Sequence, residues 1–208
     1  MFAARTDLHL MRKLWHMVTG GVGLWAFYAF DMELRTWAYL TLLVSFSGFT
    51  LDLIRLRWDF ANQIFMKVGG VVMRESEKQS FSGLPFYALG VSISLFLFPR
   101  HMALMSIFFL VISDPISSLV GILYGKDKIL PNKSVQGTLA GAITCFAIAL
   151  TYCLMFVPFS LSVLLFSIFA GILGAASELF SVVIDDNLSI PVISGIGLVA
   201  LNSIFMIF

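Results

Sequence analysis

The sequence predicts an all-α integral membrane protein that crosses the bilayer several times. Its composition is the first indication, because 59% of the 208 residues are hydrophobic and only 12% are charged. Soluble domains are about 45–50% apolar and about 25% charged, so they could not hide this much apolar surface. The mean hydropathy of +0.96 agrees with this. The third indication is that the apolar residues fall in runs close to the length of about 20 residues that a spanning helix needs.

Seven apolar runs are candidates for spanning helices, although the second is short. Pro99 and Pro158 punctuate two of the hairpins between them. No small-residue cleavage motif closes the first run, so we expect it to remain as a span rather than to be removed as a signal peptide. There is no internal repeat, and we treat residues 1–208 as one membrane-embedded domain. The predicted spans are about Leu14–Phe30, Thr36–Leu51, Phe81–Phe98, Met102–Tyr124, Thr138–Val157, Leu161–Ile184 and Ser189–Phe208.

One long polar connection, Asp52–Ser80, separates the second span from the third. Its apolar residues recur every four positions, and charged or polar residues occupy the other faces. This pattern is typical of an amphipathic helix that lies in the membrane interface, here at about residues 55–75. The alternative is a soluble helix packed on the loops. The apolar positions are Leu56, Phe60, Ile64, Val68 and Val72.

The basic residues are distributed unevenly over this topology. With seven spans, the N-terminus and the second, fourth and sixth connections share one side, which carries eleven of the 13 basic residues. The other side carries only Arg35 and Arg100. The positive-inside rule then makes the richer side cytoplasmic, in the inner membrane of a bacterium or the endoplasmic reticulum of a eukaryote. The eleven are Arg5, Arg12, Lys13, Arg55, Arg57, Lys67, Arg74, Lys78, Lys126, Lys128 and Lys133.

Residues 112–139 contain the most unusual polar group of the apolar runs. Asp114 lies inside the fourth span, where an acidic residue costs about 2.5–3.5 kcal/mol and by default marks a function. Pro115 disfavours helix at Asp114 and removes a backbone donor, which predicts a kink. Asp114 could cap a half-helix that begins at Pro115, or it could be a structural group paired with Arg12 or Lys78.

Small residues follow Asp114 at helical spacing and lead into a basic loop at about residues 125–137. The small residues suit either close helix packing or the approach of a ligand to the backbone. The lysines of the loop could bind a phosphate-rich ligand, or they could serve only to set the topology. The small residues are Ser117, Ser118, Gly121 and Gly125, and the lysines are Lys126, Lys128 and Lys133.

Further polar residues gather at the predicted cytoplasmic ends of the spans. Arg12 and His16 are four residues apart and share a helix face. Glu178 lies in the sixth span, and we expect Asp185 to follow two turns later on the same face. Basic and acidic groups from five spans would thus meet in one zone. The simpler alternatives are an ordinary interior histidine at His16 and a solvated turn at residues 185–187.

Carboxylates opposite lysines and arginines suit a Mg²⁺–nucleotide site. Hard carboxylate oxygens bind magnesium, which usually also takes phosphate oxygens, and cations offset the charge of a transferring phosphoryl group. The sequence contains no P-loop pattern, so a phosphotransferase would be of another kind. The cysteines Cys145 and Cys153 have the spacing of neither a disulfide framework nor a metal motif.

Four blocks of sequence occur in order along the chain. They are RKLWH at Arg12–His16, EKQSFSG at Glu77–Gly83, DPISSLVGILYGK followed by NKSVQGT at 114–138, and Glu178 followed by DDNLSIP at Asp185–Pro191. Together they resemble blocks of the dolichol kinase and phytol kinase family, membrane lipid kinases that use CTP as phosphoryl donor. One departure is Ser113 before Asp114, where many members of that family have glycine.

The resemblance implies roles for particular residues. It places Asp114, Gly121, Gly125, Lys126, Lys133, Ser134 and Gly137 in the CTP site, with Arg12 and Lys78 as further cations at the phosphates. It makes Glu178, Asp185, Asp186 and Asn187 the acidic partners, and Mg²⁺ would be held by Asp114, Asp185, Asp186 and Asn187. The proton of the acceptor hydroxyl would pass to Asp114, Glu178 or His16, and the sequence does not choose among them.

The activity that the resemblance implies is transfer of the γ-phosphoryl group of CTP to the hydroxyl of an isoprenoid alcohol such as dolichol, polyprenol or phytol, at the cytoplasmic face. The alternatives are a CTP-dependent diacylglycerol kinase and a phosphatidate cytidylyltransferase-like enzyme, although the longer terminal motif of the latter is absent. A secondary transporter is the rival from another class, but the charges gather at one face rather than at the midplane. The expected partners are CTP, Mg²⁺, a lipid alcohol and the bilayer without nucleic acid, and a homodimer is left open.

Overall fold

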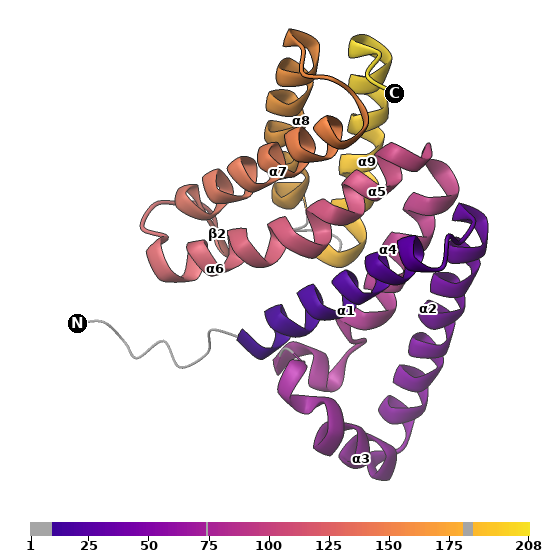
Figure 1. Ribbon diagram of the computed structural model, residues 1–208. Helices are drawn as coiled ribbons and strands as arrows, with labels where there is room; N and C mark the ends of the chain where they lie inside the picture. Colours follow the sequence, from indigo (N-terminus) through magenta and orange to yellow (C-terminus); the bar gives the residue numbers. More distant parts are fainter. Residues whose placement is uncertain (1–9, 74, 181–184) are drawn as a thin grey trace.

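Helices make up nearly all of the chain in the computed structural model, which describes residues 10–73, 75–180 and 185–208 (Figure 1). Seven helical segments overlap the seven predicted spans, with different ends in several of them. The elements are α1 (Leu10–Ala29), α2 (Leu34–Arg57), α3 (Asp59–Gly69), η1 (Gly70–Val72), η2 (Glu75–Gln79), α4 (Gly83–Leu97), α5 (Arg100–Phe108), η3 (Phe109–Ser113), α6 (Asp114–Tyr124), β1 (Lys128–Leu130), β2 (Lys133–Ser134), α7 (Val135–Phe156), α8 (Leu161–Leu179) and α9 (Asp186–Phe205).

The prediction of an all-α polytopic membrane protein is confirmed. Within the described ranges, five helices are long and apolar enough to cross a membrane, and α4 is a shorter apolar helix. The five are α2, the continuous segment Arg100–Tyr124, α7, α8 and α9. The first helix, α1, carries Arg12 and Lys13 near its start but exposes an apolar face that includes Trp15, Val18 and Val22. Predicted positions Arg5, Arg74 and 181–184 lie outside the described residues.

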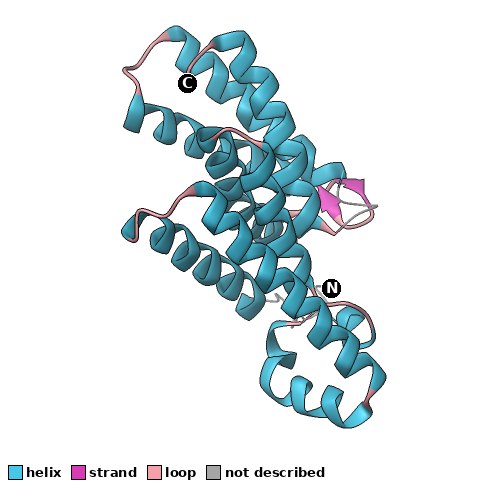
Figure 2. Cartoon of the chain, turned by 90° about the vertical axis from the view of Figure 1, so that its right-hand side faces the viewer, coloured by secondary structure: helices cyan, strands magenta, loops and turns pink. Residues whose placement is uncertain are grey.

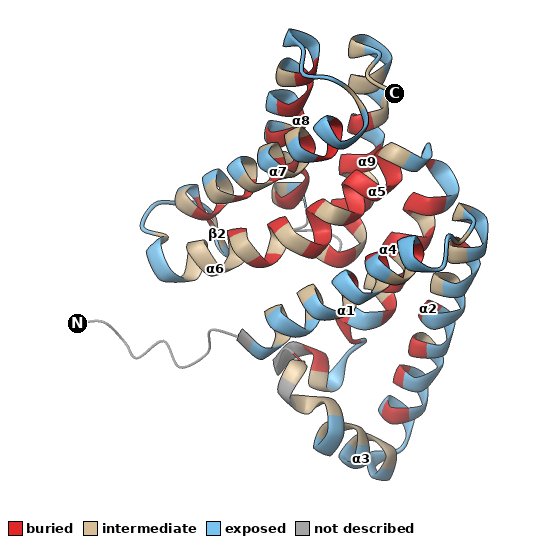
Figure 3. Cartoon of the chain, in the orientation of Figure 1, coloured by how far each residue is buried: buried red, intermediate tan, exposed pale blue. Residues whose placement is uncertain are grey.

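The buried core lies where α4, α5 and α9 cross, and the outer helices expose apolar surface (Figure 3). Phe109, Met105 and Leu198 are fully buried there, whereas exposed large apolar residues cover the outside of α2 and α7. A water-soluble protein rarely exposes such contiguous apolar surface. The distribution therefore suits a surrounding of lipid tails.

The second helix is longer than predicted, because α2 continues through two charged residues. Asp52 and Arg55 are 1% and 2% exposed, and their side chains form an ion pair with 2.6 Å between Oδ1 and Nε. This pairing allows the helix to carry both charges to its end at Arg57. The amphipathic helix expected at about residues 55–75 is correspondingly shorter, since α3 begins at Asp59 and ends at Gly69.

The fourth span is one continuous helical segment that runs from α5 into α6 (Figure 1). It contains a π-helical turn, η3, immediately before Asp114. Asp114 itself has helical dihedral angles and begins α6 without capping it. The alternative in which Asp114 caps a separate half-helix is therefore wrong. The wider turn lets the helix pass Pro115, which lacks a backbone donor, and such π-turns are frequent at functional sites.

The fourth and fifth spans form a hairpin whose tip is a small antiparallel strand pair, β1 with β2, that projects beyond the helices (Figure 2). This pair was not predicted. Behind it, α6 and α7 cross closely at glycines: a Cβ on Gly137 would lie 2.9 Å from the carbonyl oxygen of Ser117 and 3.0 Å from Cα of Gly121. Ser113 also ties the two helices, because its Oγ donates to the carbonyl of Gly141 at 3.1 Å.

The sixth and seventh spans do not place Glu178 and Asp185 on one helix face, so that expectation is wrong. Helix α8 ends at Leu179, just after Glu178. Asp185 precedes α9 and acts as its N-cap, since its Oδ1 accepts a hydrogen bond from the backbone N–H of Asn187 at 3.0 Å. A capping residue has non-helical geometry, which explains why the two acidic residues belong to different elements.

Candidate active site

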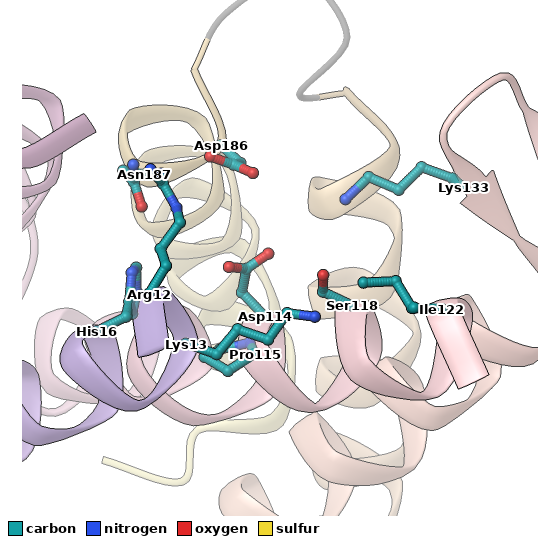
Figure 4. Close-up of a pocket in the computed structure, with 10 residues that line it drawn as sticks. All are labelled: Arg12, Lys13, His16, Asp114, Pro115, Ser118, Ile122, Lys133, Asp186 and Asn187. Carbon is teal, nitrogen blue, oxygen red and sulfur yellow. The ribbon is translucent and has the colours of Figure 1, made fainter. Parts of the chain in front are cut away.

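A polar pocket opens where α1, α6, β2 and the start of α9 converge (Figure 4). It holds about 560 Å³ of space including its open mouth. Most of its lining side chains are charged or polar. They are Arg12, Lys13, His16, Asp114, Pro115, Ser118, Ile122, Lys133, Asp186 and Asn187.

Three cations of the polar pocket come from two elements. Arg12 in α1 is held by an ion pair with Glu77, at 2.6 Å between Nη1 and Oε1. Lys13 follows it, and the Nζ of Lys13 is buried with no hydrogen-bond partner among the described residues. A buried ammonium group without such a partner is costly, so a bound anion would stabilise it. Lys133 in β2 enters from the opposite side (Figure 4).

Lys133 is held by carboxylates and stays charged. Its Nζ lies 2.6 Å from Oε1 of Glu178 at the end of α8. Burial alone would lower the pKa of Lys133, but the carboxylates of Glu178, Asp114 and Asp186 outweigh it, so the pKa lies above its usual value. The amine is therefore protonated throughout the physiological pH range, as a phosphate-binding cation requires.

The two carboxylates that line the pocket are Asp114 and Asp186, and Figure 4 shows Asp114 pointing toward Asp186. Within the described part of the chain, no group of three or more His, Cys, Asp or Glu side chains could hold a metal ion by itself. Magnesium is usually bound by only one or two carboxylates together with substrate phosphates. Asp114 and Asp186 fit that pattern, and they would hold the ion with the nucleotide.

His16 lies at the edge of the polar pocket and is oriented from two sides. Its Nε2 is 3.2 Å from the carbonyl oxygen of Leu110 in the π-helical turn. Its ring meets the ring of Tyr87 edge-on, with centroids 4.5 Å apart. A carbonyl only accepts, so Nε2 donates, and in the neutral ring Nδ1 is the nitrogen that can take up a proton.

The structure thus brings together six of the residues singled out in the sequence: Arg12, His16, Asp114, Lys133, Asp186 and Asn187. Glu178 adjoins the pocket through Lys133. Asp114 does not form the predicted structural pair with Arg12, which binds Glu77; its charge acts instead on Lys13 and Lys133.

Ser118 also lines the pocket, whereas the other residues predicted for the site do not. A Cβ added to Gly121, Gly125 or Gly137 would lie close to neighbouring side chains or backbone, as expected where close packing requires glycine. Ser134 is buried and caps α7, accepting from the N–H of Gly137 at 3.2 Å. Lys126 is exposed at the hairpin, and the backbone carbonyl of Lys78 accepts from Arg55. Asp185 caps α9.

Two further groups of residues were not predicted as part of the site. Lys13 shares the pocket with Arg12 and His16, and the spacing of positions 12, 13 and 16 on one helix could have identified it. Arg55 binds the backbone carbonyls of Glu77 at 3.0 Å and Ser80 at 2.5 Å. It thereby positions the segment that carries Glu77 and, through Glu77, Arg12.

Fold and site together define an integral membrane protein with a pocket of converging cations and carboxylates among its helices. The chain is 31% identical over 222 residues to CTP-dependent diacylglycerol kinase 1 of Saccharomyces cerevisiae, covering 96% of this chain and 76% of the yeast protein. It is 36% identical over 162 residues to the protein of the same name from Schizosaccharomyces pombe, covering 71% and 72%. The chain belongs to this family of CTP-dependent lipid kinases. No family model and no solved structure matches it.

Proposed function

We propose that this protein transfers the γ-phosphoryl group of CTP to the hydroxyl of diacylglycerol at the cytoplasmic face of its membrane. The observation that carries the proposal is the polar pocket, in which Arg12, Lys13 and Lys133 converge on Asp114 and Asp186. Cations arranged in this way would bind the phosphates and offset the negative charge that develops on the transferring group. The diacylglycerol kinases that the chain resembles support CTP as donor and diacylglycerol as acceptor.

The chain's own residues would act mainly by positioning. Arg12 and Lys133 are each anchored by a carboxylate, Glu77 and Glu178, so they would bind the phosphates without much reorganisation. The buried ammonium group of Lys13 would donate hydrogen bonds to phosphate oxygens of the same ligand. Mg²⁺ held by Asp114 and Asp186 would neutralise charge on the phosphate oxygens when bound. Holding the acceptor hydroxyl in line with the γ-phosphorus supplies much of the remaining acceleration.

The experiment is a transfer assay on the purified full chain with CTP labelled at one phosphate at a time. We expect label from the γ-phosphate to appear in phosphatidate when diacylglycerol is supplied, with release of CDP. Dolichol, a shorter polyprenol and phytol are the comparison acceptors, because the sequence blocks resemble the kinases of those alcohols. Transfer only to an isoprenoid alcohol would show that such an alcohol, and not diacylglycerol, is the acceptor. Incorporation of label from the α-phosphate would make the protein a cytidylyltransferase.

A further inference from the structure

A second pocket adjoins the polar pocket on the other side of His16. It lies between α1, the α3–η1 segment and the start of α4, and holds about 760 Å³ of space including its mouth. Its walls are largely apolar and include Trp15, Phe65, Val72 and Leu84. We propose that this apolar pocket binds the acceptor lipid, an acylated glycerol, and presents its hydroxyl to His16. The inference rests on the proposed kinase function and extends it.

The two pockets share three lining residues, Arg12, His16 and Asn187. Figure 4 shows these three together at one side of the polar pocket, away from Lys133. Arg12 is bound to Glu77, and the amide of Asn187 donates to the carbonyl of Gly83 at 3.3 Å, so both positions are defined. A phosphate in one pocket and a hydroxyl in the other would therefore meet at this boundary.

The outer wall of the apolar pocket has a second apolar face that points away from the protein. On α3, Phe60 is 76% exposed and Val68 is 84% exposed, whereas Phe65 and Gly69 line the pocket. An amphipathic helix with an exposed apolar face is suited to the membrane interface. In the proposed arrangement one face of α3 would contact the bilayer while the other bounds the pocket, which would give a lipid a direct route from the membrane to His16.

Of the three residues that could accept the hydroxyl proton, only His16 lines both pockets. Asp114 lines the polar pocket alone, and Glu178 lines neither and is bonded to Lys133. The donation from Nε2 to Leu110 leaves Nδ1 as the proton-accepting nitrogen. Tyr87 supports the ring edge-on, and its own hydroxyl is buried without a hydrogen-bond partner among the described residues.

The hydroxyl oxygen of the lipid forms a bond to the γ-phosphorus of CTP, and the bond from that phosphorus to the bridging oxygen breaks. The electron pair of the broken bond leaves on CDP. The hydroxyl proton passes to Nδ1 of His16, which later releases it to solvent through the polar pocket.

The position of the lipid is tested by filling the apolar pocket. Thr19 lines it, whereas the neighbouring Val18 is 59% exposed on the outer face of α1. In lipid nanodiscs, we expect Thr19→Phe to raise the KM for diacylglycerol about tenfold or more while the Kd for CTP stays unchanged. Val18→Phe is the matched control and should change neither. Equal behaviour of the two folded variants would overturn the proposed lipid site.

A photo-crosslinking measurement tests the same site without a substitution. Diacylglycerol with a diazirine on one acyl chain should label peptides that contain Phe65–Met73 and Trp15–Thr19. A separate apolar groove, which includes Phe108, Ile148 and Met155, shares no lining residue with the polar pocket. Labelling confined to that groove would overturn the proposed location.

His16 is tested with variants that separate hydrogen bonding from proton acceptance. Glutamine can still donate to Leu110 but cannot accept the proton, so we expect His16→Gln to lower kcat about 10²-fold or more with the lipid KM unchanged. Added imidazole should partly restore the activity of His16→Ala. A near wild-type kcat for His16→Gln would remove His16 from this role. If the wild-type protein transfers no γ-phosphate to lipid, the proposed function is wrong. If the wild type is active but the variants behave like it, only the proposed lipid site and the role of His16 are wrong.

Discussion

At the scale of single residues, Asp114 is one of the two carboxylates that line the polar pocket. Its carboxylate faces lysines from two different elements, Lys13 and Lys133. Asparagine keeps the shape of the side chain and removes the charge that would hold a magnesium–nucleotide complex. We expect Asp114→Asn to lower turnover by about 10²-fold or more, because preorganised charge supplies effects of that size. Turnover and melting temperature in detergent are the two measurements.

The matched control for Asp114→Asn is Asp127→Asn, since Asp127 is exposed at the β-hairpin. The control should keep full activity. A large fall in melting temperature of Asp114→Asn would instead indicate a structural ion pair, because stranding a buried partner costs about 3–5 kcal/mol. A stable Asp114→Asn protein with near wild-type turnover would remove Asp114 from the active site.

Variants of the Lys133–Glu178 ion pair can separate an effect on stability from an effect on activity. Both are largely buried and bound at 2.6 Å, so Lys133→Met should remove the buried counter-ion of Glu178 and cost about 3–5 kcal/mol. The double variant Lys133→Met/Glu178→Gln should recover most of the melting temperature but remain inactive, because a phosphate-binding cation is gone. Recovery of activity in the double variant would show that Lys133 is only structural.

At the scale of elements, Arg55 links the end of α2 to the segment before α4. It is buried, binds Asp52 and donates to the carbonyls of Glu77 and Ser80. Arg55→Met removes the counter-ion of the buried Asp52 carboxylate, so we expect a loss of about 3–5 kcal/mol of unfolding free energy. Arg57→Met is the control, because Arg57 is exposed at the same helix end. Chemical denaturation of both variants checks this, and equal stability would contradict it.

The crossing of α6 and α7 explains the glycines of the basic loop by packing. A Cβ on Gly137 would lie 2.9 Å from the carbonyl oxygen of Ser117, so Gly137→Ala should cost about 1–3 kcal/mol through overpacking. Gly21→Ala is the control, since nothing lies within 4 Å of a Cβ there. If Gly137→Ala instead kept its melting temperature and lost CTP binding, the glycine would serve the nucleotide, as the family resemblance implies.

Much of the fold could be predicted from the lengths of the apolar runs. Details that depend on contacts between particular side chains could not. The end of α2 was missed because Asp52 and Arg55 look like the start of a loop until their mutual burial is seen. The π-helical turn before Asp114 has no periodicity of its own in the sequence. The strand pair was missed because only five residues form it.

The candidate site was predictable where charge in an apolar run is itself unusual. Asp114 was found in this way, whereas His16 was found because it shares a helix face with Arg12, and Lys133 because it belongs to the basic loop. The structure places all three around one pocket. Lys13 was counted only as a topology determinant, although it shares that pocket. For Gly121 and Gly137 the sequence left packing and ligand approach open, because small residues at helical spacing serve both purposes equally.

At the scale of the whole molecule, the charge distribution predicts which side faces the cytoplasm. Asn132 is exposed at the hairpin tip and Pro99 is exposed between α4 and α5, while Cys145 and Cys153 are buried. A cysteine at Asn132 should react with an impermeant reagent only after the cytoplasm is opened, by the positive-inside rule. A cysteine at Pro99 should react in intact cells. The reverse pattern would invert the orientation and the proposed side of the reaction.

The contacts that Arg55 makes with Asp52, Glu77 and Ser80 also bear on how such enzymes can diversify. They join the two ends of the connection that contains α3, and α3 itself buries no residue. Insertions and deletions between two ends that are held together change the folding free energy little, because doubling the length of a loop costs only about 0.6 kcal/mol in closure entropy. Selection can therefore remodel α3 to suit lipids of different bulk while the cluster around Asp114 is inherited unchanged. We expect homologues with different lipid substrates to vary most in length and sequence between Trp58 and Met73.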